Sequence, residues 1–186
     1  MSLKVLRTVP DAPTVWFTGL SGSGKTTIAR AVAGLLTEAG LAHTLLDGDE
    51  LRATLSADLG FSREDRAEQV RRVGHLARIL GEAGAIPLVA LVSPFRVDRD
   101  AVRAMHAPGR FLEVHVATPL EVCAERDVKG LYARSAARSA AGEEDLLTGV
   151  GQDYEAPESP ELVLDGSGKG SLTELARRVA ERLRGE

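Results

Sequence analysis

The chain has 186 residues, of which 44% are apolar and 27% charged, a composition that excludes a disordered protein and fits one globular domain spanning residues 1–186. Its formal net charge of -4 argues against a nucleic-acid partner, and no apolar run approaches the roughly 20 residues of a membrane span. The single cysteine, Cys123, has no partner for an internal disulfide, and Met1 to Thr14 lack the apolar stretch of a signal peptide, so we expect a cytoplasmic protein.

In chain order, short apolar runs alternate with amphipathic helical runs, which predicts a mainly parallel α/β sheet with helical crossovers. A first strand contains Val15 and Phe17 and ends at Gly19, and a helix follows from Lys25 to about Ala39. Further elements are predicted in the same way: strands at Thr44–Leu46, Ala85–Val92 and Phe111–Ala117, and a long helix at Arg63–Glu82.

Two later stretches carry helix-start signals. Thr118-Pro119-Leu120-Glu121 combines an N-cap, a proline at the first helical position and a capping-box glutamate. Ser171 and Glu174 repeat the signal before a last helix, whose inner stripe is predicted to be Leu172, Leu175, Val179 and Leu183. Residues 127–160 contain no strand-like run and no strong apolar face, and a long segment of this kind is typical of a lid or of partial disorder. We favour a lid.

The first strand leads into a phosphate-binding loop. Residues 19–26, GLSGSGKT, satisfy the pattern G-x-x-x-x-G-K-[ST] between a predicted strand and a predicted helix, which is the context that supports it. Lys25 can neutralise the β- and γ-phosphates of ATP, and the Thr26 hydroxyl can ligate Mg²⁺. The expected nucleotide-binding residues are Gly19, Ser21, Gly22, Ser23, Gly24, Lys25, Thr26 and Thr27.

Carboxylates at the end of the second strand favour a kinase among the P-loop classes. The chain has no asparagine, so the guanine-reading N-K-x-D motif of a GTPase is absent. An ATP-driven motor is also disfavoured, because the chain is small and has no second domain for a motor to move. Asp47 and Asp49 end a predicted parallel strand and should face the phosphates. We assign Asp49 to the acceptor hydroxyl and Asp47 to the outer shell of the metal, with Lys25 as the third catalytic residue. The alternative, turn aspartates that cap a helix near Glu50, is compatible with this assignment.

Several long motifs, in order, resemble the adenylyl-sulfate (APS) kinase family. They are residues 14–27 (TVWFTGLSGSGKTT), 46–52 (LDGDELR), 58–74 (DLGFSREDRAEQVRRVG), 92–96 (VSPFR), 118–123 (TPLEVC), 126–132 (RDVKGLY) and 154–157 (YEAP). The resemblance covers nearly the whole chain. It implies a P-loop NTPase fold similar to nucleoside monophosphate kinases, with Mg²⁺ and ATP as cofactors. It also implies a small nucleotide as substrate, a homodimer, and a sulfurylase as a candidate partner.

The resemblance also implies a substrate pocket. Phe61 offers a flat face for adenine, Arg52 and Arg66 can fork onto phosphate or sulfate oxygens, and Arg126 lies where a lid closes on ATP. The implied substrate-binding residues are Asp49, Arg52, Phe61, Arg66, Gln69, Ser93, Pro94, Phe95, Arg96, Lys129, Gly130, Leu131, Tyr132 and Leu147. In such families Ser93 is sometimes given a phosphoserine role. We favour a structural or substrate-facing Ser93, because direct in-line transfer needs no protein nucleophile.

The departures from the family pattern fall on the acceptor side and the lid. Gln69 stands where the family has asparagine, Leu147 where it has an aromatic residue, and Gly151 with Gln152 where acidic residues are usual. The lid before Leu147 is a few residues longer and has lost several lysines. Three interpretations remain: an ordinary APS kinase, which we favour, a paralogue that phosphorylates another nucleotide-like hydroxyl, and a catalytically weak nucleotide-binding regulator. Intact transfer residues argue against the last.

Overall fold

The computed structural model describes residues 6–185. The predicted absence of a signal peptide therefore falls partly outside the described residues. All five strands form one parallel sheet in the order β2-β3-β1-β4-β5. The strands are β1 (Thr14–Thr18), β2 (His43–Asp47), β3 (Ile86–Ala90), β4 (Phe111–Val116) and β5 (Leu162–Leu164). The predicted fold class, a P-loop α/β fold with a parallel sheet, is confirmed.

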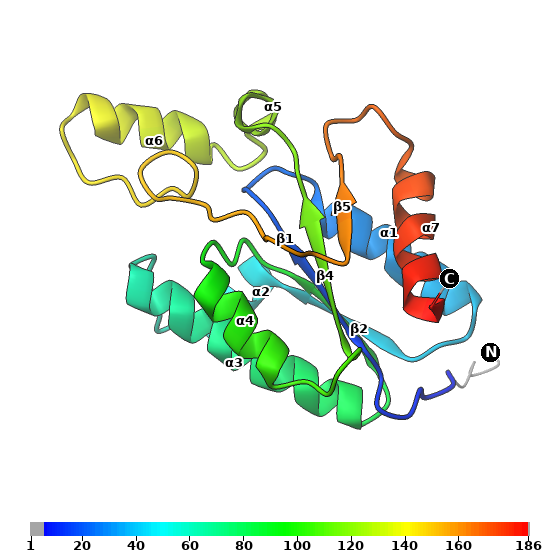
Figure 1. The fold of residues 1–186 in the computed structure, drawn as a ribbon. Coiled ribbons are helices and arrows are strands. Elements are labelled where there is room, and N and C mark those ends of the chain that lie inside the picture. The colour runs from blue at the N-terminus through cyan, green and yellow to red at the C-terminus, as the bar shows by residue number, and fades with distance from the viewer. Residues whose placement is uncertain (1–5, 186) are drawn as a thin grey trace, which may run out of the picture.

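Helices cover both faces of the sheet (Figure 1). Helices α1 (Lys25–Glu38) and α7 (Leu172–Arg184) pack on one face, and α3 (Arg63–Glu82) and α4 (Arg96–Ala104) on the other. Because side chains alternate along a strand, β1 serves both cores. Phe17 lies in the core beneath α1 and α7, whereas Trp16 packs with the inner residues of α3. Both side chains are fully buried, so β1 is a rigid base for the loop that follows it.

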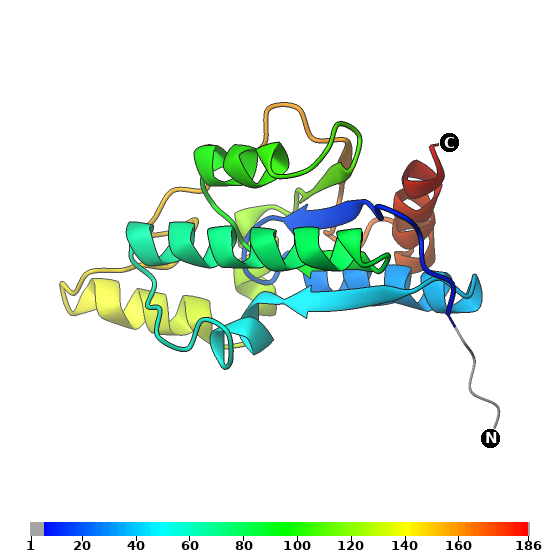
Figure 2. The same ribbon diagram turned by 90° about the horizontal axis from the view of Figure 1, so that it is seen from below.

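The remaining helices gather where the strands end. These are α2 (Gly48–Arg52), α5 (Leu120–Arg126) and α6 (Leu131–Ala140). Figure 2 shows α6 and the loop after it extending beyond the sheet. In parallel sheets, ligands bind in the crevice at the carboxyl ends of the strands. This edge is therefore where the functional site belongs.

Some sequence predictions were wrong or incomplete. Pro119, not Thr118, is the N-cap of α5, because the Thr118 hydroxyl donates instead to Ser23 O at 2.7 Å. Leu172 is 41% exposed and does not belong to the inner stripe of α7, which contains the buried Leu175 and Val179. The sequence prediction did not include α4, α6 or β5. None of the helices in residues 6–185 has the length and apolarity needed to cross a lipid bilayer.

Candidate active site

Glycines shape the loop between β1 and α1. Gly19 has φ +147°, and a Cβ on it would lie 2.6 Å from Val116 O, so no larger residue fits. Gly24, with φ 102°, is the N-cap of α1 and provides no side chain to cap the first-turn N–H groups. Uncapped N–H groups at a helix start form an anion site, and the helix dipole strengthens it. Lys25 and Thr26, the first residues of α1, line the cavity at this point.

The Lys25 ammonium folds back onto the loop. Its Nζ donates to Gly19 O at 2.9 Å and to Leu20 O at 2.6 Å. Burial, together with the nearby charge of Lys129, lowers the pKa of Lys25 to about 8. Within the loop, the Lys25 cation has carbonyl oxygens as hydrogen-bond acceptors, which carry no net charge. A bound polyphosphate would supply the missing negative charge.

One carboxylate connects the phosphate loop to the next strand end. Thr26 Oγ1 donates to Asp47 Oδ2 at 2.8 Å, while Asp47 Oδ1 accepts from the backbone N–H of Asp49 at 2.9 Å. Asp47 is therefore the N-cap of α2, as the alternative interpretation held, and at the same time a neighbour of the predicted metal ligand. Threonine and carboxylate oxygens are hard donors that suit Mg²⁺, which keeps water and phosphate as its other ligands. The residues present fit the ion.

Asp49 lies beside this pair and faces the lid. Its carboxylate forms an ion pair with Lys129, the residue two positions before α6. Both side chains are about half exposed, so the contact is solvent-screened and easily exchanged. The acceptor-side carboxylate and the phosphate-side lysine thus line one cavity, and Lys129, which also lines it, is near enough to both to act on their charges.

The cavity has a volume of about 590 Å³, large enough for small ligands. Most of the predicted residues line it: Ser21, Gly22, Gly24, Lys25, Thr26, Thr27, Asp47, Asp49, Arg52, Phe61, Arg66, Gln69, Ser93, Pro94, Lys129, Leu131, Tyr132 and Leu147. Gly19, Ser23, Phe95, Arg96, Arg126 and Gly130 are not among the lining residues.

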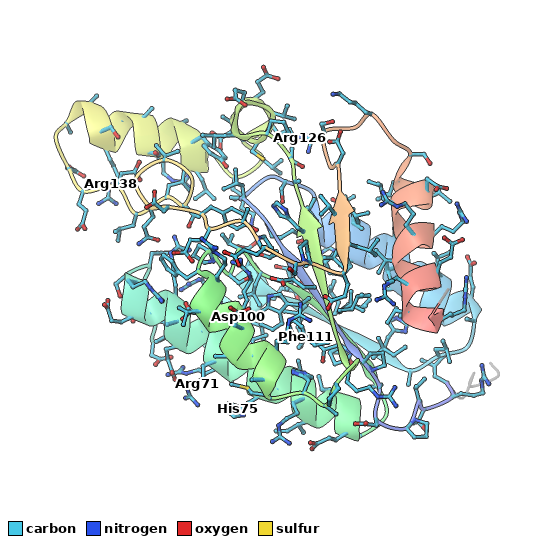
Figure 3. The ribbon with its side chains drawn as sticks, viewed as in Figure 1. Arg71, His75, Asp100, Phe111, Arg126 and Arg138 are labelled. Atoms are coloured by element: carbon cyan, nitrogen blue, oxygen red, sulfur yellow. The ribbon has the colours of Figure 1, made fainter. Side chains whose placement is uncertain are left out.

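The predicted residues that do not line the cavity have other contacts. Phe95 is the N-cap of α4, and the Arg63 guanidinium carbon lies 3.8 Å from its ring centroid. Arg96 forms an ion pair with Glu158. Arg126 donates to Gly22 O at 3.3 Å and so supports the phosphate loop from outside. Figure 3 shows Arg126 on α5 at the same end of the molecule as the lid helix.

The acceptor wall, the part of the cavity lining where the acceptor is predicted to bind, contains Phe61, Ser93, Pro94 and Leu147. The Phe61 ring is 51% exposed, and the Arg52 and Arg66 guanidinium carbons lie 4.4 Å and 5.4 Å from its centroid. Arg66 donates to Leu146 O at 2.7 Å, and burial, with the charge of Arg52, lowers its pKa to about 10. The lid loop is thereby held next to Phe61. Gln152 also contacts Phe61, because its side-chain Nε2 donates to Phe61 O at 3.1 Å.

The polar atoms of three other predicted residues form hydrogen bonds within the protein. Ser93 is 2% exposed, and its hydroxyl accepts from Trp16 Nε1 at 3.0 Å. Gln69, 4% exposed, donates to Gly48 O at 3.3 Å and so helps to place the start of α2. Tyr132 donates to Ser21 O at 2.9 Å, which joins α6 to the phosphate loop.

Several lining residues come from the lid and escaped the sequence interpretation: Arg134, Ser135, Arg138, Asp145, Leu146 and Thr148. The spacing of Arg134 and Arg138, four residues apart, would have placed both on one helix face. Figure 3 shows Arg138 on α6. Asp145 accepts a hydrogen bond from Ser135, which lowers the pKa of the Asp145 carboxyl and fixes the loop after α6.

The sequence matches those of known proteins along most of its length. Residues 11–165 match the family described as adenylylsulphate kinase. An adenylyl-sulfate kinase of Shewanella amazonensis is 50% identical over 169 residues, 91% of this chain and 83% of that protein. One from Acaryochloris marina is 48% identical over 169 residues, 91% of this chain and 80% of that protein.

A solved structure agrees with this match. It is the Mycobacterium tuberculosis APS kinase CysC in complex with AMPPNP and APS, 44% identical, with a TM-score of 0.86 over 95% of this chain and 99% of that one. A gluconokinase from Sinorhizobium meliloti, 22% identical with a TM-score of 0.58, shares the fold. By both its sequence and its fold, the chain belongs to the adenylyl-sulfate kinase family.

Proposed function

We propose that this protein transfers the γ-phosphoryl group of ATP to the 3′-hydroxyl of adenylyl sulfate, giving ADP and 3′-phosphoadenylyl sulfate. The observation that carries the proposal is one cavity with two differently equipped ends. Lys25 and Thr26 lie at the phosphate end, Asp49 lies between the ends, and Phe61 with two arginines lies at the other. This arrangement suits a triphosphate donor and a planar, anionic acceptor.

Each residue has a part in the transfer. Lys25 neutralises charge on the terminal phosphates, which lowers the barrier to phosphoryl transfer. Thr26 and Asp47 would hold Mg²⁺, which supplies further charge neutralisation on the β- and γ-oxygens. Asp49 accepts the proton that the 3′-hydroxyl loses as its oxygen bonds to phosphorus and the bond to the ADP oxygen breaks. For this step the ion pair between Lys129 and Asp49 must break. Lys129 can then pair with the negative charge of the acceptor.

Direct transfer is the favoured route. The Ser93 hydroxyl is buried and occupied by Trp16 and Thr18, so a phosphoserine at this position would require breaking that network and burying a dianion. Ser93 instead shapes the acceptor wall. Residues 127–160 act as the lid and exclude water, which would otherwise hydrolyse ATP.

A second candidate, a paralogue for another nucleotide-like hydroxyl, is favoured by the acceptor wall itself. Leu147 gives that wall an aliphatic side chain, and Gln152 binds the backbone of Phe61. Adenine stacking on one face is then replaced by apolar contact. The enzyme would then discriminate less strongly between adenine and other bases of the acceptor.

The test is a coupled ADP-release assay with adenylyl sulfate and a panel of other nucleosides and nucleotides. Adenylyl sulfate should have the highest kcat/KM, and Lys25→Ala should lose turnover while its circular dichroism spectrum stays unchanged. Preference for another acceptor would establish the paralogue. Tight nucleotide binding without turnover on any acceptor would instead identify a regulator.

The family resemblance supports three further proposals: a cytoplasmic location, a homodimer, and a sulfurylase as partner. Sedimentation of the purified protein tests the dimer, and co-sedimentation with a sulfurylase tests the partner. A single species of monomer mass would rule out the dimer.

A further inference from the structure

The acceptor wall of the cavity contains a backbone conformation that needs support. Ser93 has φ 39°, in the left-handed region that non-glycine residues rarely adopt. Such a conformation is strained and persists only where several contacts hold it in place. Ser93 and Pro94 line the cavity, so the shape of this turn is part of the acceptor site. Whatever holds the turn influences how an acceptor fits.

Two side chains from outside the cavity supply that support: Thr18, whose hydroxyl donates to Val92 O at 2.7 Å, and Arg99. Arg99 on α4 is 1% exposed, and its Nη1 donates to Ser93 O at 2.7 Å. Its Nε donates to Glu113 Oε1 on β4 at 2.7 Å, and its Nη2 to Glu155 O at 2.7 Å. The planar guanidinium is the one side chain that can hold several acceptors in a fixed fork.

The third of these contacts belongs to the chain that returns from the lid. Glu155 N donates to Pro94 O at 2.9 Å, so residue 155 is bound to the acceptor turn by its own backbone as well. The neighbouring Tyr154 shares a hydrogen bond with Thr18 Oγ1 at 3.0 Å. Thr18 Oγ1 lies 3.1 Å from the Ser93 hydroxyl. The end of the lid and the acceptor turn are therefore one hydrogen-bonded unit with Arg99 at its centre.

We infer that Arg99 is a positioning residue that fixes the acceptor wall and the base of the lid in one geometry. It touches neither nucleotide nor acceptor. It acts by holding the Ser93 carbonyl and the Glu155 carbonyl at a constant separation while the rest of the lid moves. The inference rests on the proposed transfer to a nucleotide hydroxyl, because that reaction gives the wall its function.

The alternative is an ordinary buried ion pair, and the chain offers a matched control. Arg103, one helical turn further along α4, binds the same Glu113 at 3.1 Å and also pairs with Glu161. None of its hydrogen bonds in the described part of the chain goes to residues 92–94 or 153–157. If Arg99 only stabilised the fold, then Arg99→Lys and Arg103→Lys would have the same consequences.

The experiment compares Arg99→Lys with Arg103→Lys in full-length protein. Arg99→Lys keeps the charge for Glu113 but loses the fork, so kcat/KM for adenylyl sulfate should fall about tenfold while KM for ATP changes by less than about twofold. Arg103→Lys should lower Tm and leave both constants near wild type. Equal kinetic losses in the two variants, or none in Arg99→Lys, would overturn the inference.

Two further measurements keep the test decisive. Trypsin should cut after the lid residues Arg134 and Arg138 about fivefold faster in Arg99→Lys than in Arg103→Lys, because cleavage follows the open population. This readout needs no acceptor, so it still judges the inference if wild type does not phosphorylate adenylyl sulfate. Should Arg99→Lys fail to fold, Tyr154→Phe removes only the hydroxyl that binds Thr18. It should lower kcat/KM for the acceptor about threefold with KM for ATP unchanged, and wild-type values would count against the inference.

Discussion

Nucleotide binding should be coupled to protonation of Lys25. Burial and the charge of Lys129 lower the pKa of this amine to about 8. Phosphate oxygens favour the ammonium form, so bound nucleotide should raise the pKa again. The affinity then falls as the pH rises through the lowered pKa, since deprotonated Lys25 must first take up a proton. Between about pH 7 and about pH 9 the protonated fraction drops about tenfold, and so should the affinity for Mg-ADP.

Calorimetry can measure this coupling directly. Titrations of Mg-ADP at about pH 8, in buffers of different ionisation enthalpy, should report an uptake of about half a proton per site. Lys25→Met removes the group and should abolish the uptake while the protein stays folded. The same uptake in Lys25→Met, or none in wild type, would refute the assignment of the shifted amine to the nucleotide site.

Three other changes have defined outcomes. Asp49→Asn should lower kcat about a hundredfold or more, because the proton acceptor is lost, with Mg-ADP affinity by calorimetry within about twofold; an unchanged kcat would remove Asp49 from the transfer step. Leu147→Phe should tighten adenylyl sulfate binding by about threefold to tenfold through stacking, and unchanged or weaker binding in equilibrium titrations would show that this position does not stack. Leu88→Ala, at a fully buried core position, should lower the free energy of unfolding by about 3 kcal/mol. The half-exposed Val163→Ala on β5 should cost less than about 0.5 kcal/mol, and equal losses in denaturant titrations would contradict the described core.

The sequence predicted those parts of the fold that local patterns determine. The helix Arg63–Glu82 was predicted with its observed bounds from its apolar period. The structure adds its N-cap, because the Ser62 hydroxyl accepts from Asp65 N at 3.1 Å. The Ser171 cap is confirmed, since its hydroxyl accepts from Glu174 N at 3.1 Å. The proximity of Asp47 to the phosphate loop was also predictable, because both follow the ends of parallel strands.

Other features depend on contacts between distant segments. Thr118 carries a strong capping pattern, but a carbonyl of the phosphate loop, distant in sequence, binds its hydroxyl instead. After Leu131 and Tyr132, the apolar residues of helix α6 are all alanines. Its buried positions, Tyr132 and Ser135, are held by hydrogen bonds to Ser21 and Asp145. No local period reveals such partners. The contribution of Arg134 and Arg138 to the cavity follows from that packing and was missed for the same reason.

The two carboxylate oxygens of Asp47 accept hydrogen bonds from different parts of the cavity. One receives the Thr26 hydroxyl from the donor half, and the other receives the amide that starts the short helix of the acceptor half. If Thr26 and Asp47 held Mg²⁺, the hydrogen bond between them would be given up, while Asp47 Oδ1 would still accept from the Asp49 amide. Asp47 thus links the position of Thr26 to the start of the helix that carries Asp49. Kinetic constants for the two substrates should consequently change together in any Thr26 variant, even though Thr26 never meets the acceptor.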